Sequence, residues 1–491
     1  MTLPTGERCQ GPLLLSARWL IGHQDGQHQI LEHGELVIEQ DRVIFVGFDY
    51  PGEVAERLNF GEAVISPGFI DLDALSDLDT TILAFDNQPA WQKGRVWPRS
   101  YIERGPYEMY TADELAFQKH FAFAQLIKNG ITTALPIASL FYREWGETVA
   151  EFEAASEAAI DLGLRVYLGP AYRTGNQVVE ADGRISTQFD EPRGLQGLAD
   201  AIAFCQQHEG QNNDLIRTML APDRIETCTA TLLQRSADAA RDLDVPIRLH
   251  CCQSPTEIDI VRRLHDLTPP EWLEQVGFLS ERALLPHATQ VSGRDLDIIR
   301  DNGASIVHCP LVSGRHGGAI RSFARYKAMG QRIGLGTDTW PPDMILNMQV
   351  GLILCRLLDG NAQACRSEDY FDAATLGGAQ ALRRPDLGRL QAGAKADIAV
   401  IDLAHTLQTP DPLQSLMTGS SGRDVRTVFI DGRLVMHERV IPGFDEDAAC
   451  ARAQQQFDGL IARYPERTFG HPPLSDIFSS SYPRRRKGDK A

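Results

Sequence analysis

Apolar runs of strand length alternate with stretches of helical periodicity between about residues 65 and 384. This alternation is typical of parallel βα units. The clearest helix follows Thr111, which forms a capping box with Glu114, and it ends at Asn129-Gly130. The strands expected in this region cover residues 64–72, 131–135, 165–169, 216–221, 246–251, 283–287, 304–309 and 333–336.

Eight parallel strands separated by eight helical crossovers predict an α/β fold, a closed (β/α)8 barrel of the TIM type. In such a barrel the active site lies at the carboxyl ends of the strands. The residues directly after each predicted strand are therefore the first place to look for chemistry.

Short strands without helical crossovers mark both ends of the chain. They are predicted at 13–21, 34–38 and 42–46, with a hairpin turn at Gln40-Asp41, and again at 396–401 and 425–430, before the turn Asp431-Gly432. We predict that residues 1–64 and 386–440 form one discontinuous β-sandwich domain, that residues 65–385 form the barrel, and that residues 441–491 form a C-terminal helix and a basic tail.

The composition narrows the class of protein. With 491 residues, 43% hydrophobic and 23% charged, the chain fits a globular enzyme with more than one core. The formal charge of -18 argues against a nucleic-acid partner, since phosphate binding needs clustered Lys and Arg. No signal segment or membrane-length apolar run is apparent, so we expect a cytoplasmic protein without a membrane partner. The nine scattered cysteines predict free thiols, and Cys251-Cys252 is not expected to bind metal.

Polar groups follow four consecutive predicted strands. They are His250, His287, His308 and Asp338. A single histidine in a sequence is ordinarily structural, but four such groups at one barrel mouth indicate function. Two imidazoles and a carboxylate that converge are suited to hold a divalent cation and to activate water.

These groups stand within motifs that together resemble the amidohydrolase superfamily, in its branch of triazine chlorohydrolases and aminohydrolases. The motifs are Ile65-Ser66-Pro67-Gly68-Phe69-Ile70-Asp71, His250, Pro286-His287-Ala288, His308-Cys309-Pro310 and Leu335-Gly336-Thr337-Asp338. Segments 373–379 and 388–397 also match, and the resemblance covers about residues 10–440.

The resemblance implies a hydrolase that cleaves a C–N or C–halogen bond of a small, cyclic or heteroaromatic nitrogen compound. It implies that His250 binds metal, that His287 binds metal or contacts the substrate and attacking water, and that Asp338 is a ligand and proton shuttle. It also implies a homodimer.

The sequence departs from the family pattern at two places. The His-x-His motif expected after the first strand falls on Asp73 and Leu75. Leu75 has no lone pair to offer, whereas the oxygens of Asp73 suit a hard cation. The acidic residue expected three positions after His250 is Gln253, which can form hydrogen bonds but cannot exchange a proton. Gln253 is kept among the candidate catalytic residues.

Three interpretations stay open. In the first, one divalent ion (zinc, iron or manganese) is held by His250, His287 and Asp338, with Asp73 or water, or by the two histidines alone. In the second there is no metal: Asp338 is the general base, His287 or His308 polarises the substrate, and an acidic stretch that includes Asp73 binds a cationic group. In the third, the chain is a retired paralogue that serves as a binding or assembly module.

Further residues are candidates for contact with a small-molecule substrate. Trp91 and Trp97 belong to a polar-aromatic insertion at 79–110 that either walls a pocket or packs on the barrel rim. Arg173 follows the third predicted strand, where it either contacts a charged substrate group or forms a salt bridge. Trp340 is close behind Asp338 and either lines the pocket or packs under its loop.

Overall fold

Eight short parallel strands form the centre of the molecule. The computed structural model describes residues 6–78, 96–104, 108–138, 140, 143, 145–291 and 293–485. The central strands are β8 (Phe69–Leu75), β10 (Ile131–Ile137), β11 (Arg165–Leu168), β15 (Ile216–Thr218), β17 (Ile247–Arg248), β18 (Ala283–Pro286), β19 (Ser305–His308) and β20 (Arg332–Leu335). They form two parallel sheets, in the orders β15-β11-β10-β8 and β17-β18-β19-β20.

Backbone hydrogen bonds join these two sheets on both sides. Between β15 and β17, the Arg248 N–H donates to the Leu220 carbonyl at 2.9 Å, and Leu220 forms a parallel bridge with Ile247. Between β20 and β8, the Asp338 N–H donates to the Asp73 carbonyl at 2.8 Å. The eight strands thus follow one another round a barrel in sequence order, and the predicted TIM-type α/β fold is confirmed.

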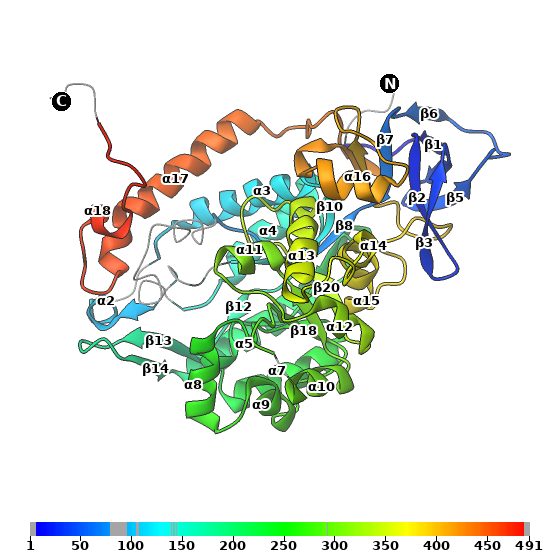
Figure 1. The fold of residues 1–491 in the computed structure, drawn as a ribbon. Helices are drawn as coiled ribbons and strands as arrows, with labels where there is room; N and C mark the ends of the chain where they lie inside the picture. The colour runs from blue at the N-terminus through cyan, green and yellow to red at the C-terminus, as the bar shows by residue number, and fades with distance from the viewer. Residues whose placement is uncertain are drawn as a thin grey trace.

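Helices cover the outside of the barrel (Figure 1). In chain order the barrel helices are α3 (Ala112–Lys128), α4 (Val149–Leu162), α5 (Glu191–His208), α6 (Gln211–Asp214), α7 (Ala230–Leu243), α8 (Pro255–His265), α9 (Pro269–Gln275), α10 (Arg294–Asp301), α11 (Pro310–Arg315), α12 (Phe323–Ala328), α13 (Met344–Leu358), α14 (Ser367–Asp372) and α15 (Gly378–Ala381). The predicted capping box of α3 is present, with the Glu114 N–H donating to Thr111 Oγ1 and the Thr111 N–H to Glu114 Oε2.

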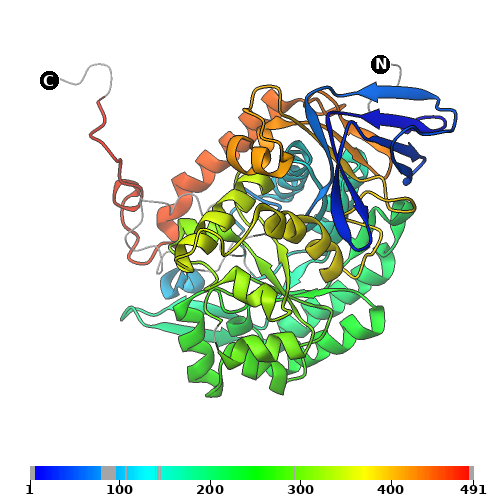
Figure 2. The same ribbon diagram turned by 45° about the vertical axis from the view of Figure 1, so that its right-hand side comes forward.

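The two chain ends build two further sheets beside the barrel (Figure 2). A six-stranded sheet has the order β23-β22-β21-β7-β2-β3, and a four-stranded sheet has the order β5-β4-β1-β6. A shared apolar core that includes Leu13, Leu36, Ile398 and Phe429 connects them. Their strands are β1 (Leu13–Ser16), β2 (Trp19–Gln24), β3 (Gln27–Glu32), β4 (Glu35–Glu39), β5 (Arg42–Gly47), β6 (Glu56–Asn59), β7 (Ala63–Pro67), β21 (Ile398–Asp402), β22 (Val425–Ile430) and β23 (Arg433–Met436).

Two predicted strands are wrong because the chain changes sheets within an apolar run. Residues 13–21 form β1 and β2, which lie in different sheets. Residues 64–72 form β7 in the six-stranded sheet and β8 in the barrel, separated by Gly68. A Cβ at Gly68 would lie 2.1 Å from Thr132 Oγ1, so only glycine allows this close passage.

A hairpin that the periodicity did not reveal follows β12 (Ala171–Tyr172). It consists of β13 (Gly175–Val179) and β14 (Ile185–Phe189), and it projects beside α2 (Arg99–Glu103) in Figure 1. The short strand β9 (Trp97–Pro98) pairs with β13. Of the predicted insertion at 79–110, the structure describes β9, α2 and the residues around them; residues 79–95 and 105–107, with Trp91, lie outside the described residues.

The chain continues past the sandwich strands into a long helix, α17 (Glu446–Arg467), followed by α18 (Leu474–Ile477). Leu460 and Tyr464 of α17 pack with Leu115 of α3, and Ala449 and Ala453 pack near Phe121. Before it, α16 (Pro412–Gly419) lies against α13 and α14. Within the described residues, no helix has the length and apolarity that crossing a membrane requires.

Candidate active site

Four predicted site residues lie together at the carboxyl ends of the barrel strands. His250 Nε2 is 3.9 Å from Asp73 Oδ2, and His287 Nε2 is 3.6 Å from Asp338 Oδ2. The two imidazole rings stack with their centroids 5.5 Å apart. Asp73, His250 and His287 are buried. Residues separated by up to 265 positions in the sequence, from 73 to 338, thus form one cluster.

Left-handed backbone conformations occur where the chain leaves these strands. His287 has φ 73°, Asp338 has φ 45° and Cys252 has φ 56°. Such angles are costly for residues other than glycine, and they concentrate at functional sites, where the surroundings hold them. Here the His287 N–H donates to the Val307 carbonyl at 2.9 Å, and the Gln290 N–H donates to the Cys252 carbonyl at 2.9 Å.

A backbone carbonyl sets the tautomer of His250. Its Nδ1 lies 2.8 Å from the Asp223 carbonyl oxygen, which can only accept, so Nδ1 carries the proton. Nε2 then carries the lone pair, and it lies 3.9 Å from Asp73 Oδ2. Burial, followed by the positive charges of Arg224 and Arg248, holds the pKa of His250 well below its usual range. The ring is therefore neutral at neutral pH.

Asp73 is bound by an arginine that the sequence analysis missed. Arg248 Nη1 donates to Asp73 Oδ1 at 2.9 Å, and the Cys309 thiol lies 3.8 Å from Asp73 Oδ2. Both members of the ion pair are buried. Burial raises the pKa of Asp73 to about 7 despite the attraction of Arg248. Arg248 lies two positions before His250, and because alternate residues of a strand share a face, both side chains point into the barrel. This spacing is the signal by which the sequence could have identified Arg248.

Asp71 has a structural role in this arrangement. Its carboxylate accepts the Thr337 N–H at 3.0 Å and the Thr337 hydroxyl, and it also accepts the Asp73 N–H at 3.1 Å. Burial raises the pKa of Asp71 to about 6. Asp71 thereby ties the end of β8 to the segment that carries Asp338.

Gln253 lies beside the cluster and is held by Arg224, whose Nη1 donates to Gln253 Oε1. The next carboxylate, Glu257, accepts the N–H groups of Cys252 and Gln253 through its two oxygens. Its potential ligand atom lies within 4.8 Å of those of Cys251 and Cys252. Because both oxygens already serve the backbone, we assign Glu257 a structural role. The nine cysteines are free, as predicted.

His308 is not part of the cluster. Its ring centroid lies 6.1 Å from that of Phe323 and 6.2 Å from that of Tyr370, in the helix layer. The neighbouring Cys309 is the residue that reaches Asp73. His308 ends β19 and Cys309 follows it directly, so the two side chains point to opposite faces and cannot both face the site.

Replacing His308 with phenylalanine is expected to weaken the dependence of stability on pH. Burial lowers the pKa of His308 to about 3, so below about pH 6.5 the unfolded chain binds a proton that the folded chain does not. This stability is present above the unfolded pKa and is lost as the pH falls, by about 2 kcal/mol at pH 5. Urea unfolding at pH 7 and pH 5 measures the difference. The exposed His405→Phe is the control; equal pH dependence in native protein and His308→Phe would contradict this assignment.

The predicted substrate residues occupy different surroundings. Arg173 lies 5.9 Å from the ring centroids of both Trp97 and Trp145, and its Nη1 is 3.5 Å from Asp223 Oδ2. Among the described residues, nothing accepts a hydrogen bond from its buried Nε and Nη2. Burial lowers the pKa of Arg173 to about 10. Trp340 stacks on Phe121 of α3, with the ring centroids 5.4 Å apart.

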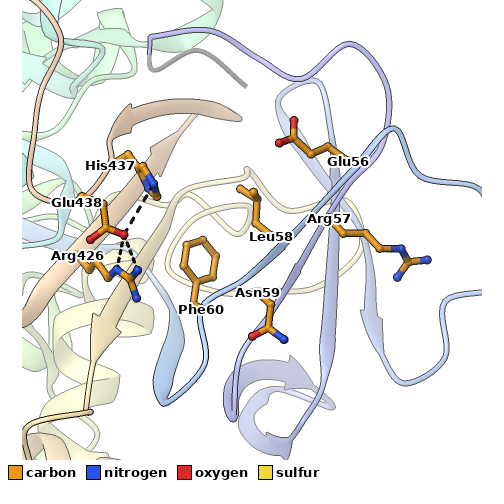
Figure 3. Close-up of a pocket in the computed structure, with 8 residues that line it drawn as sticks. All are labelled: Glu56, Arg57, Leu58, Asn59, Phe60, Arg426, His437 and Glu438. Carbon is orange, nitrogen blue, oxygen red and sulfur yellow. Dashed lines mark hydrogen bonds and ion pairs between the residues drawn. The ribbon is translucent and has the colours of Figure 1, made fainter. Parts of the chain in front are cut away.

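A cleft of about 330 Å³ lies elsewhere, in the two-sheet part of the molecule (Figure 3). It is lined by residues 56–60 of the β6 region and by Arg426, His437 and Glu438. Arg426 Nε donates to Glu438 Oε1 at 2.6 Å. None of the predicted site residues contributes to its lining, so we do not assign the chemistry to this cleft.

The Amidohydrolase family model matches residues 76–435. The chain belongs to the amidohydrolase family. This membership confirms the resemblance and the predicted class, an amidohydrolase-type hydrolase. The match begins just after Leu75, so it does not include the altered first motif.

Similar proteins include deaminases and a chlorohydrolase. A 5-methylthioadenosine/S-adenosylhomocysteine deaminase of Natronomonas pharaonis is 24% identical over 87% of this chain and 93% of its own. An adenosine deaminase of Xanthomonas campestris with bound zinc has a TM-score of 0.73 at 20% identity, over 91% of this chain and 98% of that one. An atrazine chlorohydrolase mutant of Arthrobacter aurescens, complexed with zinc and atraton, also has a TM-score of 0.73. It is 21% identical, over 90% of this chain and 99% of that one.

Proposed function

We propose that the chain hydrolyses a C–N or C–halogen bond of a small heteroaromatic nitrogen compound. The observation that carries the proposal is the placement of His287 Nε2 3.6 Å from Asp338 Oδ2, beside His250 at the barrel mouth. An imidazole and a carboxylate in contact can move a proton between water and a leaving group. The names of the similar proteins, which are deaminases and a chlorohydrolase, support the same bond types.

The residues present do not fit the zinc site named for two of these similar structures. Leu75 offers no ligand atom where the first motif should supply its second histidine. Asp73, which stands in place of the first histidine, already has a cationic partner in Arg248 at 2.9 Å. We therefore propose a reaction whose steps rest on the side chains alone, which was the second of the three interpretations.

In this reaction Asp338 is the general base. Its carboxylate accepts a proton from a water molecule as the water oxygen attacks the ring carbon, and the bond to the leaving group then breaks. The protonated Asp338 returns that proton to a departing amine. A halide leaves as the anion, and Asp338 then releases its proton to the solvent. His287 polarises the substrate by a hydrogen bond to the ring. Without Lewis-acid stabilisation, the reaction requires an electron-poor ring.

Turnover of a defined panel tests the proposal. Native protein is incubated with amino- and halo-substituted heteroaromatic rings, cyclic amides and cyclic ureas, and release of ammonia, amine or halide is measured. We expect turnover of at least one electron-poor ring. If no compound of these classes is hydrolysed, the proposal fails and the interpretation as a retired paralogue gains support.

Arg173 is proposed to bind an acceptor-bearing group of the substrate, with Trp97 beside it. Two of its buried donor atoms have no partner in the described part of the chain, and leaving buried donors unsatisfied is costly. Arg173→Met is expected to raise KM about 10- to 100-fold, with a smaller effect on kcat. This factor corresponds to the binding free energy of one hydrogen bond from a charged group. Steady-state kinetics on the substrate identified above measures both.

The control for Arg173→Met is Arg193→Met. The guanidinium of Arg193 also lies over the Trp145 ring, 4.9 Å from its centroid, but it belongs to α5 on the outside of the barrel. An equal increase of KM in both variants would show that the effect comes from Trp145 packing and not from substrate contact.

A further inference from the structure

A buried guanidinium lies directly beside the carboxylate that replaces the first histidine of the metal motif. Arg248 is 2% exposed and Asp73 is fully buried, and they belong to β17 and β8, which are not neighbours in either sheet. The contact therefore crosses the barrel interior. A carboxylate in such a place is very costly unless it is paired.

The donor atoms that a metal ion would require are nevertheless close together. One ligand atom each from Asp73, His250 and His287 lies within 4.8 Å of the others. The difference from a metal centre lies in the charge, because Arg248 already supplies a positive charge to Asp73 at 2.9 Å. The guanidinium stays protonated at any pH that a folded protein tolerates, so this charge is permanent.

The positive charge of Arg248 would also act on a bound ion. A divalent cation between Asp73, His250 and His287 would be repelled by the guanidinium, which already contacts Asp73 at 2.9 Å. The cluster can therefore satisfy its buried carboxylate without an ion.

We propose that the Arg248 guanidinium is the built-in cation of this site, and that it takes the place of a divalent metal ion in holding Asp73 beside His250 and His287. The proposal concerns what holds the site together, and it does not depend on which substrate is hydrolysed. It predicts that removing the arginine charge, while keeping Asp73, creates a metal site.

The experiment compares four proteins by elemental analysis and by thermal unfolding with and without zinc or manganese. Native protein, purified without chelator, is expected to contain far less than one ion per chain and to unfold at the same temperature in both conditions. Arg248→Met leaves Asp73 without its counter-charge, and it is expected to bind roughly one ion per chain and to unfold at a higher temperature when the ion is present.

Two further variants are matched controls. Arg248→Lys keeps the positive charge and is expected to bind no metal. Arg248→Met with Asp73→Asn removes both charges, and it is expected to fold and to show no response to zinc. If Arg248→Met alone does not fold in buffer, refolding it with zinc or manganese is expected to recover it.

Three results would contradict the proposal. Near-stoichiometric metal in native protein would overturn the proposal. The proposal also fails if Arg248→Met folds but binds no ion. It fails as well if Arg248→Met does not fold, is not recovered by zinc or manganese, and the double variant does fold. Hydrolysis by native protein is measured separately, so failure of the proposed function leaves this result intact.

Discussion

Asp338→Asn is expected to lower kcat about 100- to 10,000-fold, the range for loss of a general base. Asparagine has nearly the same shape and tolerates the left-handed backbone that Asp338 adopts, with φ 45°. The amide cannot accept the proton of the attacking water. We therefore expect kcat to fall and the unfolding temperature to stay the same, as measured by steady-state kinetics and by thermal unfolding followed by circular dichroism.

A suitable control for this variant is Asp266→Asn. Asp266 is an exposed residue that ends α8 with φ 57°, so it repeats the same substitution in the same backbone conformation away from the site. It is expected to leave kcat unchanged. Equal turnover by native protein and Asp338→Asn would remove Asp338 from the mechanism.

Lys119→Met is expected to cost about 3–5 kcal/mol of unfolding free energy, the usual effect of breaking a buried ion pair from one side. Lys119 Nζ lies 3.1 Å from Glu151 Oε1 and 3.4 Å from Glu147 Oε1, and it donates to Ser76 Oγ at 2.8 Å. All three charged side chains are at most 2% exposed. Glu147 would lose its cationic partner, and the end of β8 would lose a hydrogen bond to α3. Urea unfolding measures the loss.

Two variants test the cause of that loss. Adding Glu147→Gln to Lys119→Met removes the uncompensated charge and is expected to restore part of the stability. Lys327→Met removes an ion pair with Asp369, in which the lysine side chain is 47% exposed. It is expected to lower the unfolding free energy by less than about 1 kcal/mol. A similar loss in Lys327→Met and Lys119→Met would show that burial of the network is not the reason.

The architecture was largely predictable because it rests on local patterns. Helix α3 begins and ends where its capping box and Asn129-Gly130 indicate, and β22 has the bounds that its apolar run predicts. The errors arose where one apolar run serves two sheets, as at Gly68, because hydrophobic periodicity reports burial and not the identity of the neighbouring strand. The hairpin β13–β14 was missed because the first four residues of its second strand are all half-buried and only the last is exposed, so the strand shows no alternation.

The candidate site was predictable in part. Strand-end position identified His250, His287 and Asp338, which do lie together. The same criterion also selected His308, which the structure places in the helix layer. The period of two along a strand assigns His308 and Cys309 to opposite faces, but it does not say which face is inside.

The residues alone were sufficient to identify this chain as a (β/α)8 barrel with an altered amidohydrolase motif. They were sufficient because strand and helix periodicity and the residue types at strand ends are local properties. The tertiary structure alone decided that Arg248 binds Asp73 and that Asp71 holds Thr337. These contacts join residues 175 and 266 positions apart, and they depend on how the barrel closes. Whether a buried carboxylate is free to bind a cation or is already neutralised is therefore a property of the fold, since the partner can come from any strand that faces the same interior.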